Sequence, residues 1–396
     1  MNQATGLHDA APVLAVDRYV RLFLIVGLIS MAVSLLGALF TPQQFFQSYL
    51  FAYVCLIGLV IGALAVLMMQ YLTGGAWGLI LRRVLESITS TMPLMIVLFV
   101  PLLFGLHSLY IWTHHEIVSA EPVLQHKHAF LNVPFFLTRA ALYFVCWLVF
   151  ALLLNHWSRK QDVTGEPRLA WWLEHVSGPG LFILAITLTL AMIDWAMSIE
   201  PRWYSTIYPV IYMAGDVLAA LAFGIGVVLL LGRRAPFVYV LRTRHWRDLG
   251  NMLLAFVMLW AYCAFSQYLL IWSGNLREEI KWYLPRKSGG WGWIALALIV
   301  FHFFLPFLLL LSRQVKERSL LLFSVVVIVL ALRFVDVYWL IGPAFSPFHF
   351  TISWLDFVIP IGIGGLWLAF FTKQLAQRPL LPLKDPYAEE ALNAEE

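Results

Sequence analysis

Charged residues are scarce in this chain of 396 residues. Asp, Glu, Lys and Arg make up only 12% of it, whereas an ordinary soluble domain contains about 25%. Hydrophobic residues make up 61%, and the mean hydropathy is +0.82. A soluble domain cannot hide this much apolar surface from water, so the composition excludes one and indicates a chain that folds in a lipid bilayer.

Cysteine is equally scarce. Cys55, Cys146 and Cys263 are far apart and fall singly in separate hydrophobic runs. The absence of a Cys-x-x-Cys pair argues against a zinc site or an iron–sulfur cluster. Histidine is also unsuited to a transmembrane haem, because His107 and His302 fall at different depths of their runs and make a poor axial pair.

The sequence does contain ten long hydrophobic runs. A helix of about 20 apolar residues crosses a hydrocarbon core of roughly 30 Å, and in lipid the backbone must form its hydrogen bonds within its own segment. The sequence therefore predicts an all-α polytopic membrane protein. The predicted spans are Tyr19–Phe40, Tyr49–Tyr71, Thr91–Trp112, Pro134–Trp157, Gly180–Ile199, Ile207–Leu231, Leu249–Trp272, Trp291–Ser312, Ser319–Ile341 and Ser353–Lys373.

Positive charge is distributed unevenly between the two sides of these spans. Most of the 26 Lys and Arg residues fall in connections on the side that also holds both termini. Because cytoplasmic loops carry the excess of Lys and Arg, we predict that both termini are cytoplasmic. The net charge of +4 is thus a signal of topology and does not indicate nucleic-acid binding. We expect the tail from Gln374 to be solvated or docked on a partner.

Two pairs of short motifs recur in the chain. His107–Trp112 near the end of the third span matches Gln267–Trp272 near the end of the seventh, and Asp194–Pro201 at the end of the fifth matches Asp336–Pro343 at the end of the ninth. This repeat predicts two parallel four-helix bundles, formed by spans 2–5 and 6–9, with spans 1 and 10 peripheral. The corresponding segments are 1–18 (cytoplasmic N-terminal segment), 19–48 (first peripheral span), 49–204 (first bundle), 205–345 (second bundle), 346–373 (tenth, peripheral span) and 374–396 (cytoplasmic tail).

Three polar residues of the first bundle form the first candidate site. An ionisable side chain in the hydrocarbon costs about 2.5–3.5 kcal/mol on insertion scales, so each one is a functional hypothesis by default. His107, Arg139 and Asp194 fall near the outer ends of their spans. Together they would contact a quinone oxygen and accept the proton of a quinol. An equally good interpretation is that Arg139 and Asp194 only neutralise each other and that His107 packs within the bundle.

A longer set of polar residues falls in the second bundle. Arg333 and Asp336 are three residues apart, so an intrahelical ion pair is the simplest interpretation. Asp216 and His302 fall near mid-membrane, where a proton relay needs titratable groups. The complete set of proton-path candidates is Tyr208, Tyr212, Asp216, Tyr262, Ser266, Gln267, His302, Arg333 and Asp336. Each of them alone is also accounted for by an interhelical hydrogen bond.

Four segments carry a resemblance to a known family. They are Asn132–Arg139, Asp194–Ser205, Phe265–Trp272 and Arg333–Trp339. They resemble the NrfD-type (polysulfide-reductase-like) membrane subunits of bacterial alternative complex III, and the smaller, ActF-type subunits in particular. The resemblance extends over essentially all ten spans.

The resemblance implies a subunit of a quinol:cytochrome c or quinol:oxidase electron-transfer complex in the bacterial cytoplasmic (inner) membrane. No cofactor is expected in the chain itself. The implied partners are a larger, ActC-like NrfD-type subunit, an iron–sulfur subunit, haem c subunits and a terminal oxidase, with the iron–sulfur clusters and haem c on the partners. The ActC-like subunit is the better candidate for the quinol site, so quinone contact and proton translocation by this chain both stay open.

Two other functions also fit the sequence. An independent secondary transporter would be built from parallel repeats with buried charge, and it often has helices broken at matching positions of both halves. Pro93 and Pro101 of the third span have no counterpart in the seventh. The third reading is a purely structural membrane anchor.

Overall fold

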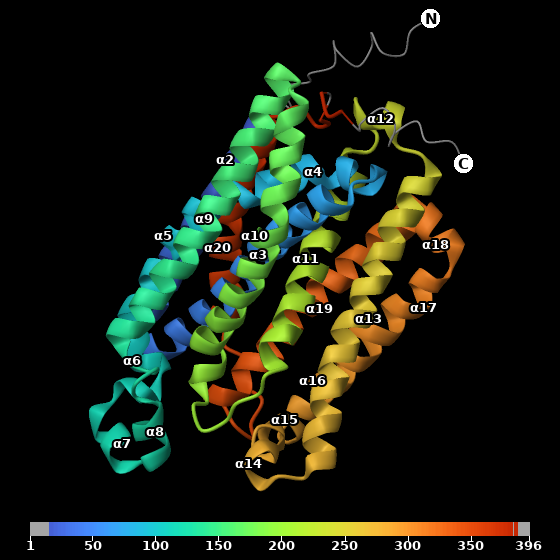
Figure 1. The fold of residues 1–396 in the computed structure, drawn as a ribbon. Helices are drawn as coiled ribbons and strands as arrows, with labels where there is room; N and C mark the ends of the chain where they lie inside the picture. The colour runs from blue at the N-terminus through green and yellow to red at the C-terminus, as the bar shows by residue number, and fades with distance from the viewer. Residues whose placement is uncertain (1–15, 383, 387–396) are drawn as a thin grey trace, which may run out of the picture.

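The regular structure of the chain is helical throughout the part described, residues 16–382 and 384–386 of a computed structural model (Figure 1). Nine helices in this part are long and apolar enough to cross a bilayer. A bent pair of helices makes a tenth if it is counted as one span. The helical class and the number of candidate spans therefore agree with the prediction.

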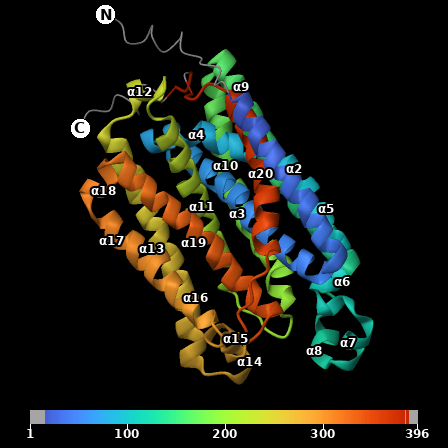
Figure 2. The same ribbon diagram turned by 180° about the vertical axis from the view of Figure 1, so that it is seen from behind.

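The helices lie roughly along one direction. α2 begins and α20 ends at the same end of the molecule, which we call the terminal end; α7, α8, α14 and α15 lie at the opposite end, which we call the loop end (Figures 1 and 2). The long elements are α2 (Asp17–Phe40), α3 (Pro42–Thr73), the pair α4 (Ala76–Thr89) and α5 (Met92–Phe104), α9 (Val133–Thr164), α10 (Pro167–Trp195), α11 (Tyr208–Leu231), α13 (Thr243–Gly274), the series α16 (Trp291–Ala297), η3 (Leu298–Phe304) and α17 (Leu305–Leu311), α19 (Ser319–Phe345) and α20 (Leu355–Ala376). The short ones are α6 (Leu106–Leu109), η1 (Ile111–Thr113), α7 (His115–Ala120), α8 (Pro122–Lys127), η2 (Met197–Ile199), α12 (Phe237–Val240), α14 (Arg277–Ile280), α15 (Tyr283–Lys287) and α18 (Arg313–Glu317).

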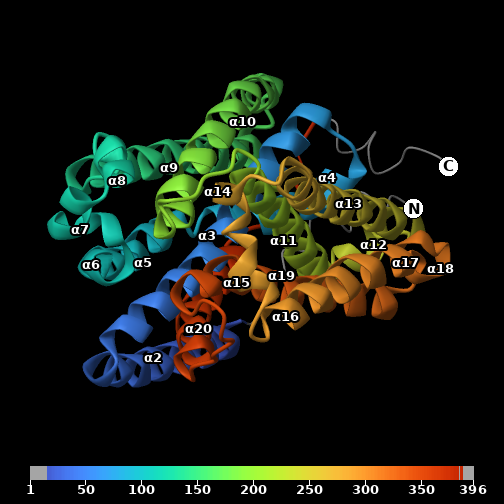
Figure 3. The same cartoon turned by 90° about the horizontal axis from the view of Figure 1, so that it is seen from below.

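α3 and α11 lie at the centre and pack against each other (Figure 3). α3 also contacts α4, α10 and α20, and α9 packs on α10 and α5. On the other side α11 contacts α13 and α19, and α13 packs on α17. α2 packs mainly along α20 at the edge of the molecule. Among the single long candidate spans, α3 and α11 are thus the two most enclosed by protein.

Two glycines allow the central helices to approach closely. A Cβ at Gly62 of α3 would lie 2.1 Å from the carbonyl oxygen of Asp216 on α11, and one at Gly58 would lie 2.3 Å from Oδ1 of the same residue. Small residues at this spacing are the usual means by which membrane helices bring their backbones together. The contact places the Asp216 carboxylate between α3 and α11.

The outward faces of the peripheral helices are apolar. Exposed large hydrophobic side chains occur along α2, α9, α13 and α17, for example Leu36, Leu142, Leu259 and Leu308. Contiguous exposed apolar surface on this scale is unfavourable in water and is what a lipid-facing surface requires. The fold therefore suggests a membrane protein, as the composition does.

The third span differs from its predicted bounds Thr91–Trp112. The structure has instead α4 and α5, which together cover Ala76 to Phe104 with a bend of 41°. Hydropathy missed α4 because Arg83 and Glu86 interrupt its apolar run, although both are buried. α5 ends at Phe104, so the motif that begins at His107 lies beyond the helix.

Several other boundaries also differ. α10 begins at Pro167 rather than Gly180, and α9 continues to Thr164, so that α9 has 32 residues. At 1.5 Å per residue such a helix is about 48 Å long and exceeds the hydrocarbon core, so hydropathy alone locates only its middle.

The tail is partly buried where the structure describes it. Arg378, Leu380 and Leu381 are buried, whereas Gln377, Pro379 and Lys384 are exposed, so the predicted solvated tail is present only in part. Docking of the tail on a partner stays a prediction. Residues 1–15 of the predicted N-terminal segment, and residues 383 and 387–396 of the predicted tail, lie outside the described residues.

Candidate functional site

Three buried charged residues meet where α11 and α19 cross. Arg333 Nη2 of α19 donates to Asp216 Oδ1 of α11 at 2.9 Å, and Arg333 Nη1 donates to Asp336 Oδ2 on its own helix. All three side chains are buried. The predicted Arg333–Asp336 pair is therefore present, but Asp216 joins it from a helix more than 100 residues away. We call Asp216, Arg333 and Asp336 the charge triad.

The local sequence makes room for this triad. Arg333 and Asp336 are three residues apart and so lie on one face of α19. Gly215 of α11 leaves space for the guanidinium, since a Cβ there would lie 2.3 Å from Arg333 Cζ. Gly58 of α3 does the same for the Asp216 carboxylate. The triad is thus enclosed by helix backbones on two sides.

The triad carries one more negative charge than positive charge when both carboxylates are ionised. Asp216 Oδ2 is buried and has no hydrogen-bond partner among the described residues. A buried polar atom without a partner is rare in native structures and calls for a water, an ion or a proton. The arrangement can therefore bind one proton, which would make it neutral in a medium where unpaired charge is costly.

Trp260 of α13 connects the triad to His302. Its indole Nε1–H donates to Asp336 Oδ2 at 3.1 Å. Its ring meets the His302 ring edge-on, with 4.3 Å between the centroids. His302 is fully buried in the π-helical segment η3, and neither of its ring nitrogens has a hydrogen-bond partner among the described residues. Such π-helical segments are frequent at functional sites.

Two tyrosines adjoin the triad on the side of the loop end. Arg333 Nη2 also lies 3.4 Å from the carbonyl oxygen of Tyr212, and the Tyr212 hydroxyl lies 3.3 Å from that of Tyr208. Both tyrosines are buried in α11. The predicted four-residue spacing of Tyr208, Tyr212 and Asp216 thus does place them along one buried face.

Two of the three path candidates predicted on α13 do not lie on its buried face. Tyr262 is 68% exposed and points out of the bundle, and Ser266 is only half-buried. The third candidate, Gln267, is buried, and it follows Trp260 and Cys263 at the three- and four-residue spacing of a helix face. Trp260 was missed in the sequence, although its place on this face was readable from that spacing.

Arg139 of α9 and Asp194 of α10 form a second buried pair. Arg139 Nε and Nη2 donate to the two oxygens of Asp194 at 2.9 and 2.6 Å, and the Tyr143 hydroxyl donates to Asp194 Oδ2 at 2.8 Å. The remaining Arg139 Nη1 donates to the carbonyl of Phe130. This pair is neutral, and both carboxylate oxygens are satisfied. It matches the interpretation of a structural ion pair.

His107 does not join this pair. It is exposed at the loop end, within hydrogen-bonding distance of Thr113 (3.2 Å) and stacked on His114 with 3.8 Å between ring centroids. The reason is the early end of α5 at Phe104, which leaves His107 in the short element α6. The predicted grouping of His107 with Arg139 and Asp194 is therefore not present.

A third charged cluster, at the terminal end, was missed in the sequence. Glu86 of α4 is fully buried and accepts hydrogen bonds from Arg83, Arg378, Ser158 and Tyr71 at 2.8, 2.9, 2.6 and 3.1 Å. We call Glu86 and these four residues the Glu86 cluster. Its only local signal was the three-residue spacing of Arg83 and Glu86, because Ser158 comes from α9 and Arg378 from the segment after α20.

An apolar layer separates the Glu86 cluster from the triad. Gly224, which follows Asp216 by eight residues or about 12 Å along α11, faces Leu81 and Leu85 of α4. The intervening residues from Leu218 to Ala222 are apolar and buried. The residues of α11 between the two clusters therefore offer no side chain that could pass a proton from one cluster to the other.

Replacing Arg378 by glutamine is expected to lower the free energy of unfolding by about 1.5 kcal/mol, the usual contribution of hydrogen bonds to charged groups. Arg378 donates to Glu86, Asn155 and Ser90, whereas Arg83 would still neutralise Glu86. Steric trapping in bicelles would measure the change. An exposed arginine of α10, Arg168, provides the control, and an equal loss in Arg168→Gln would contradict the assignment.

No group of three or more His, Cys, Asp or Glu side chains in the described part of the chain is arranged to hold a metal ion. No protein-family model and no curated protein sequence matches the chain.

Proposed function

We propose that this chain is a cofactor-free membrane subunit of a quinol-oxidising respiratory complex and that its charge triad holds and releases a proton. The observation that carries the proposal is the surplus carboxylate of the triad. A second carboxylate beside a single buried cation adds a desolvation cost that a purely structural pair avoids. The second carboxylate is useful, however, if the triad binds a proton and releases it again.

The Arg139–Asp194 pair supports this assignment by contrast. Asp194 holds the position of the first bundle that corresponds to Asp336 in the repeat, but there one cation faces one carboxylate and both carboxylate oxygens are satisfied. A balanced pair of this kind has no need of a proton. We therefore assign proton binding to the second bundle and a structural role to the first.

The architecture proposed for this role is a pair of parallel four-helix bundles. The contacts of α3 with α4, α5 and α10, and of α9 with α10, support the first; the contacts of α11 with α13 and α19, and of α13 with α17, support the second. We propose that the terminal end is cytoplasmic in a bacterial inner membrane. An ActC-like subunit, iron–sulfur and haem c subunits and a terminal oxidase are the proposed partners.

A secondary transporter is less well supported. Its helices would be interrupted at matching positions in both halves. The third span is bent by 41° between α4 and α5, but α13, its counterpart in the repeat, runs unbroken from Thr243 to Gly274. Substrate uptake by proteoliposomes that contain only this chain would reverse this judgement.

The Asp216→Asn substitution tests the proposal. It removes the surplus charge and leaves Arg333 and Asp336 as a neutral pair, so the protein is expected to fold. Infrared spectroscopy of the wild type is expected to show a protonated carboxyl group near neutral pH that is missing in the variant. In the isolated complex, quinol-driven proton translocation is expected to fall at least tenfold, as for loss of one proton-transfer group.

Two control variants make the result specific. Tyr262→Phe removes an exposed hydroxyl from α13 and is expected to leave proton translocation unchanged. Asp194→Asn disrupts the first-bundle pair and is expected to lower stability while the infrared band remains. Unchanged translocation in Asp216→Asn would favour a purely structural anchor, and purification without iron–sulfur and haem c partners would refute the respiratory assignment.

A further inference from the structure

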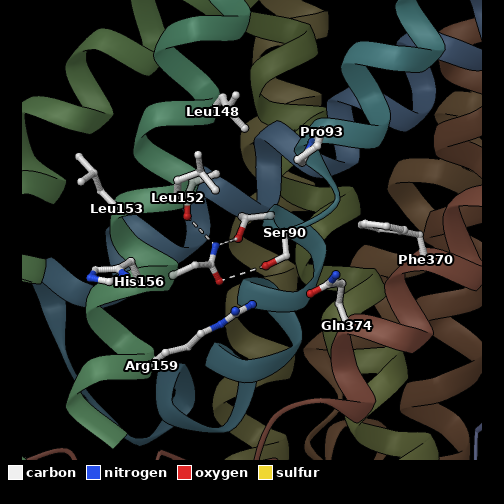
Figure 4. Close-up of a pocket in the computed structure, with 12 residues that line it drawn as sticks. Ser90, Pro93, Leu148, Leu152, Leu153, His156, Arg159, Phe370 and Gln374 are labelled. Carbon is white, nitrogen blue, oxygen red and sulfur yellow. Dashed lines mark hydrogen bonds between the residues drawn. The ribbon is translucent and has the colours of Figure 1, made fainter. Parts of the chain in front are cut away.

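A cavity of about 560 Å³ lies beside the Glu86 cluster, at the break between α4 and α5 and away from the triad (Figure 4). Leu148 and Leu152 of α9, Pro93 of α5 and Phe370 of α20 give it apolar walls. Leu152 is 55% exposed on the outward face of α9, so this wall continues into the lipid-facing surface. The cavity therefore opens sideways from the bundle toward the membrane.

Two kinds of polar group line this cavity. Asn155 is used within the protein: its Nδ2 donates to Thr89 Oγ1 at 2.9 Å, and its Oδ1 accepts from Arg378 at 2.7 Å. The side chains of Arg159 and Gln374 form no hydrogen bond or ion pair with the described residues. Both point into the cavity, from α9 and α20 respectively (Figure 4). The free polar groups are thus the Arg159 guanidinium, the Gln374 amide and the imidazole of His156, which also lines the cavity.

No carboxylate of the described residues forms an ion pair with Arg159, although the other nearby arginines are paired. Arg83 and Arg378 are matched by Glu86 and Asp162, with which they form ion pairs. Burial lowers the pKa of Arg378, and the nearby Arg159 lowers it further, against the opposing effect of Glu86. An anion at Arg159 would reduce the repulsion between these cations.

We propose that this cavity binds an anionic phospholipid, with the phosphodiester at Arg159 and Gln374 and an acyl chain along Leu148 and Leu152. A guanidinium matches the planar arrangement of phosphate oxygens, and basic recesses between membrane helices at this level commonly hold anionic headgroups. Arg159 and Gln374 lie near the ends of their helices, where the hydrocarbon meets the headgroup layer. A neutral quinone would leave the Arg159 charge unbalanced, so the lipid is the better match. The inference does not depend on quinol chemistry.

Native mass spectrometry of the full-length protein with added phosphatidylglycerol or phosphatidylcholine tests this inference. The wild type is expected to bind phosphatidylglycerol more tightly. Arg159→Gln is expected to weaken that binding about fivefold, the factor that one arginine contributes at an anionic lipid surface. The matched variant Arg168→Gln, on the next helix, is expected to leave it unchanged.

A second variant tests the cavity rather than the charge. Leu152→Trp places a larger apolar group on a lipid-facing position and is expected to reduce phosphatidylglycerol binding by narrowing the cavity. Equal binding of both lipids by the wild type, or equal losses in Arg159→Gln and Arg168→Gln, would overturn the inference. Displacement of the bound lipid by decylubiquinone at a lower concentration would assign the cavity to a quinone instead.

Discussion

The Arg333→Gln variant is expected to unfold with a free energy about 3–5 kcal/mol lower than that of the wild type. The substitution removes the cation that both Asp216 and Asp336 contact, and it leaves two carboxylates buried among the helices without a cation. Breaking a buried ion pair from one side is costly because the remaining charge has no compensation. Steric trapping in bicelles, or the yield of folded protein from the membrane, would measure this loss.

The triple variant Arg333→Gln, Asp216→Asn, Asp336→Asn provides the control. It removes all three charges together, so most of the lost stability should return even though the guanidinium is absent. A single variant Arg333→Gln that loses less than about 1 kcal/mol, the range of an exposed pair, would show that the triad is hydrated rather than enclosed.

The second large effect is expected at the contact of the two central helices. Gly62→Ala should lower the free energy of unfolding by about 3 kcal/mol, at the upper end of the usual cost of overpacking. The added methyl group would meet the backbone carbonyl of Asp216 at 2.1 Å, and a backbone atom cannot rotate away as a side chain can. α3 and α11 would have to separate, which would also loosen the contact of Arg333 with Asp216.

Gly364→Ala of α20 is the matched control, because a Cβ at Gly364 has no atom within 4 Å. It should be neutral or slightly stabilising, since alanine favours the helix more than glycine does. Equal thermal stability of the Gly62→Ala and Gly364→Ala proteins would show that the α3–α11 contact is looser than described.

The spans were predictable because a backbone in lipid must form its hydrogen bonds within its own segment, so each long apolar run becomes a helix. The boundaries were less so, and α4 illustrates why. Arg83 and Glu86 lower the hydropathy of this helix, but they neutralise each other, and Glu86 also pairs with Arg378 from the other end of the chain. Hydropathy scores each charge as if it stood alone in lipid, so it excluded a helix that is in fact buried.

Some of the candidate residues were also predicted correctly from the sequence, and others were not. Tyr208, Tyr212 and Asp216 follow from one helix period and were correctly expected on one face. Tyr262 was placed on the path by the same argument, but it is exposed, because a periodic pattern does not say which face of α13 turns inward.

The sequence by itself determined that this chain is helical and apolar on its outside, because so few charged residues leave no other way to satisfy the backbone and the surface. Only the tertiary structure decided that Arg333 serves two carboxylates while Arg139 serves one. That difference depends on how distant helices are rotated and how closely glycine lets them approach. Neither quantity is contained in the local pattern of a single span.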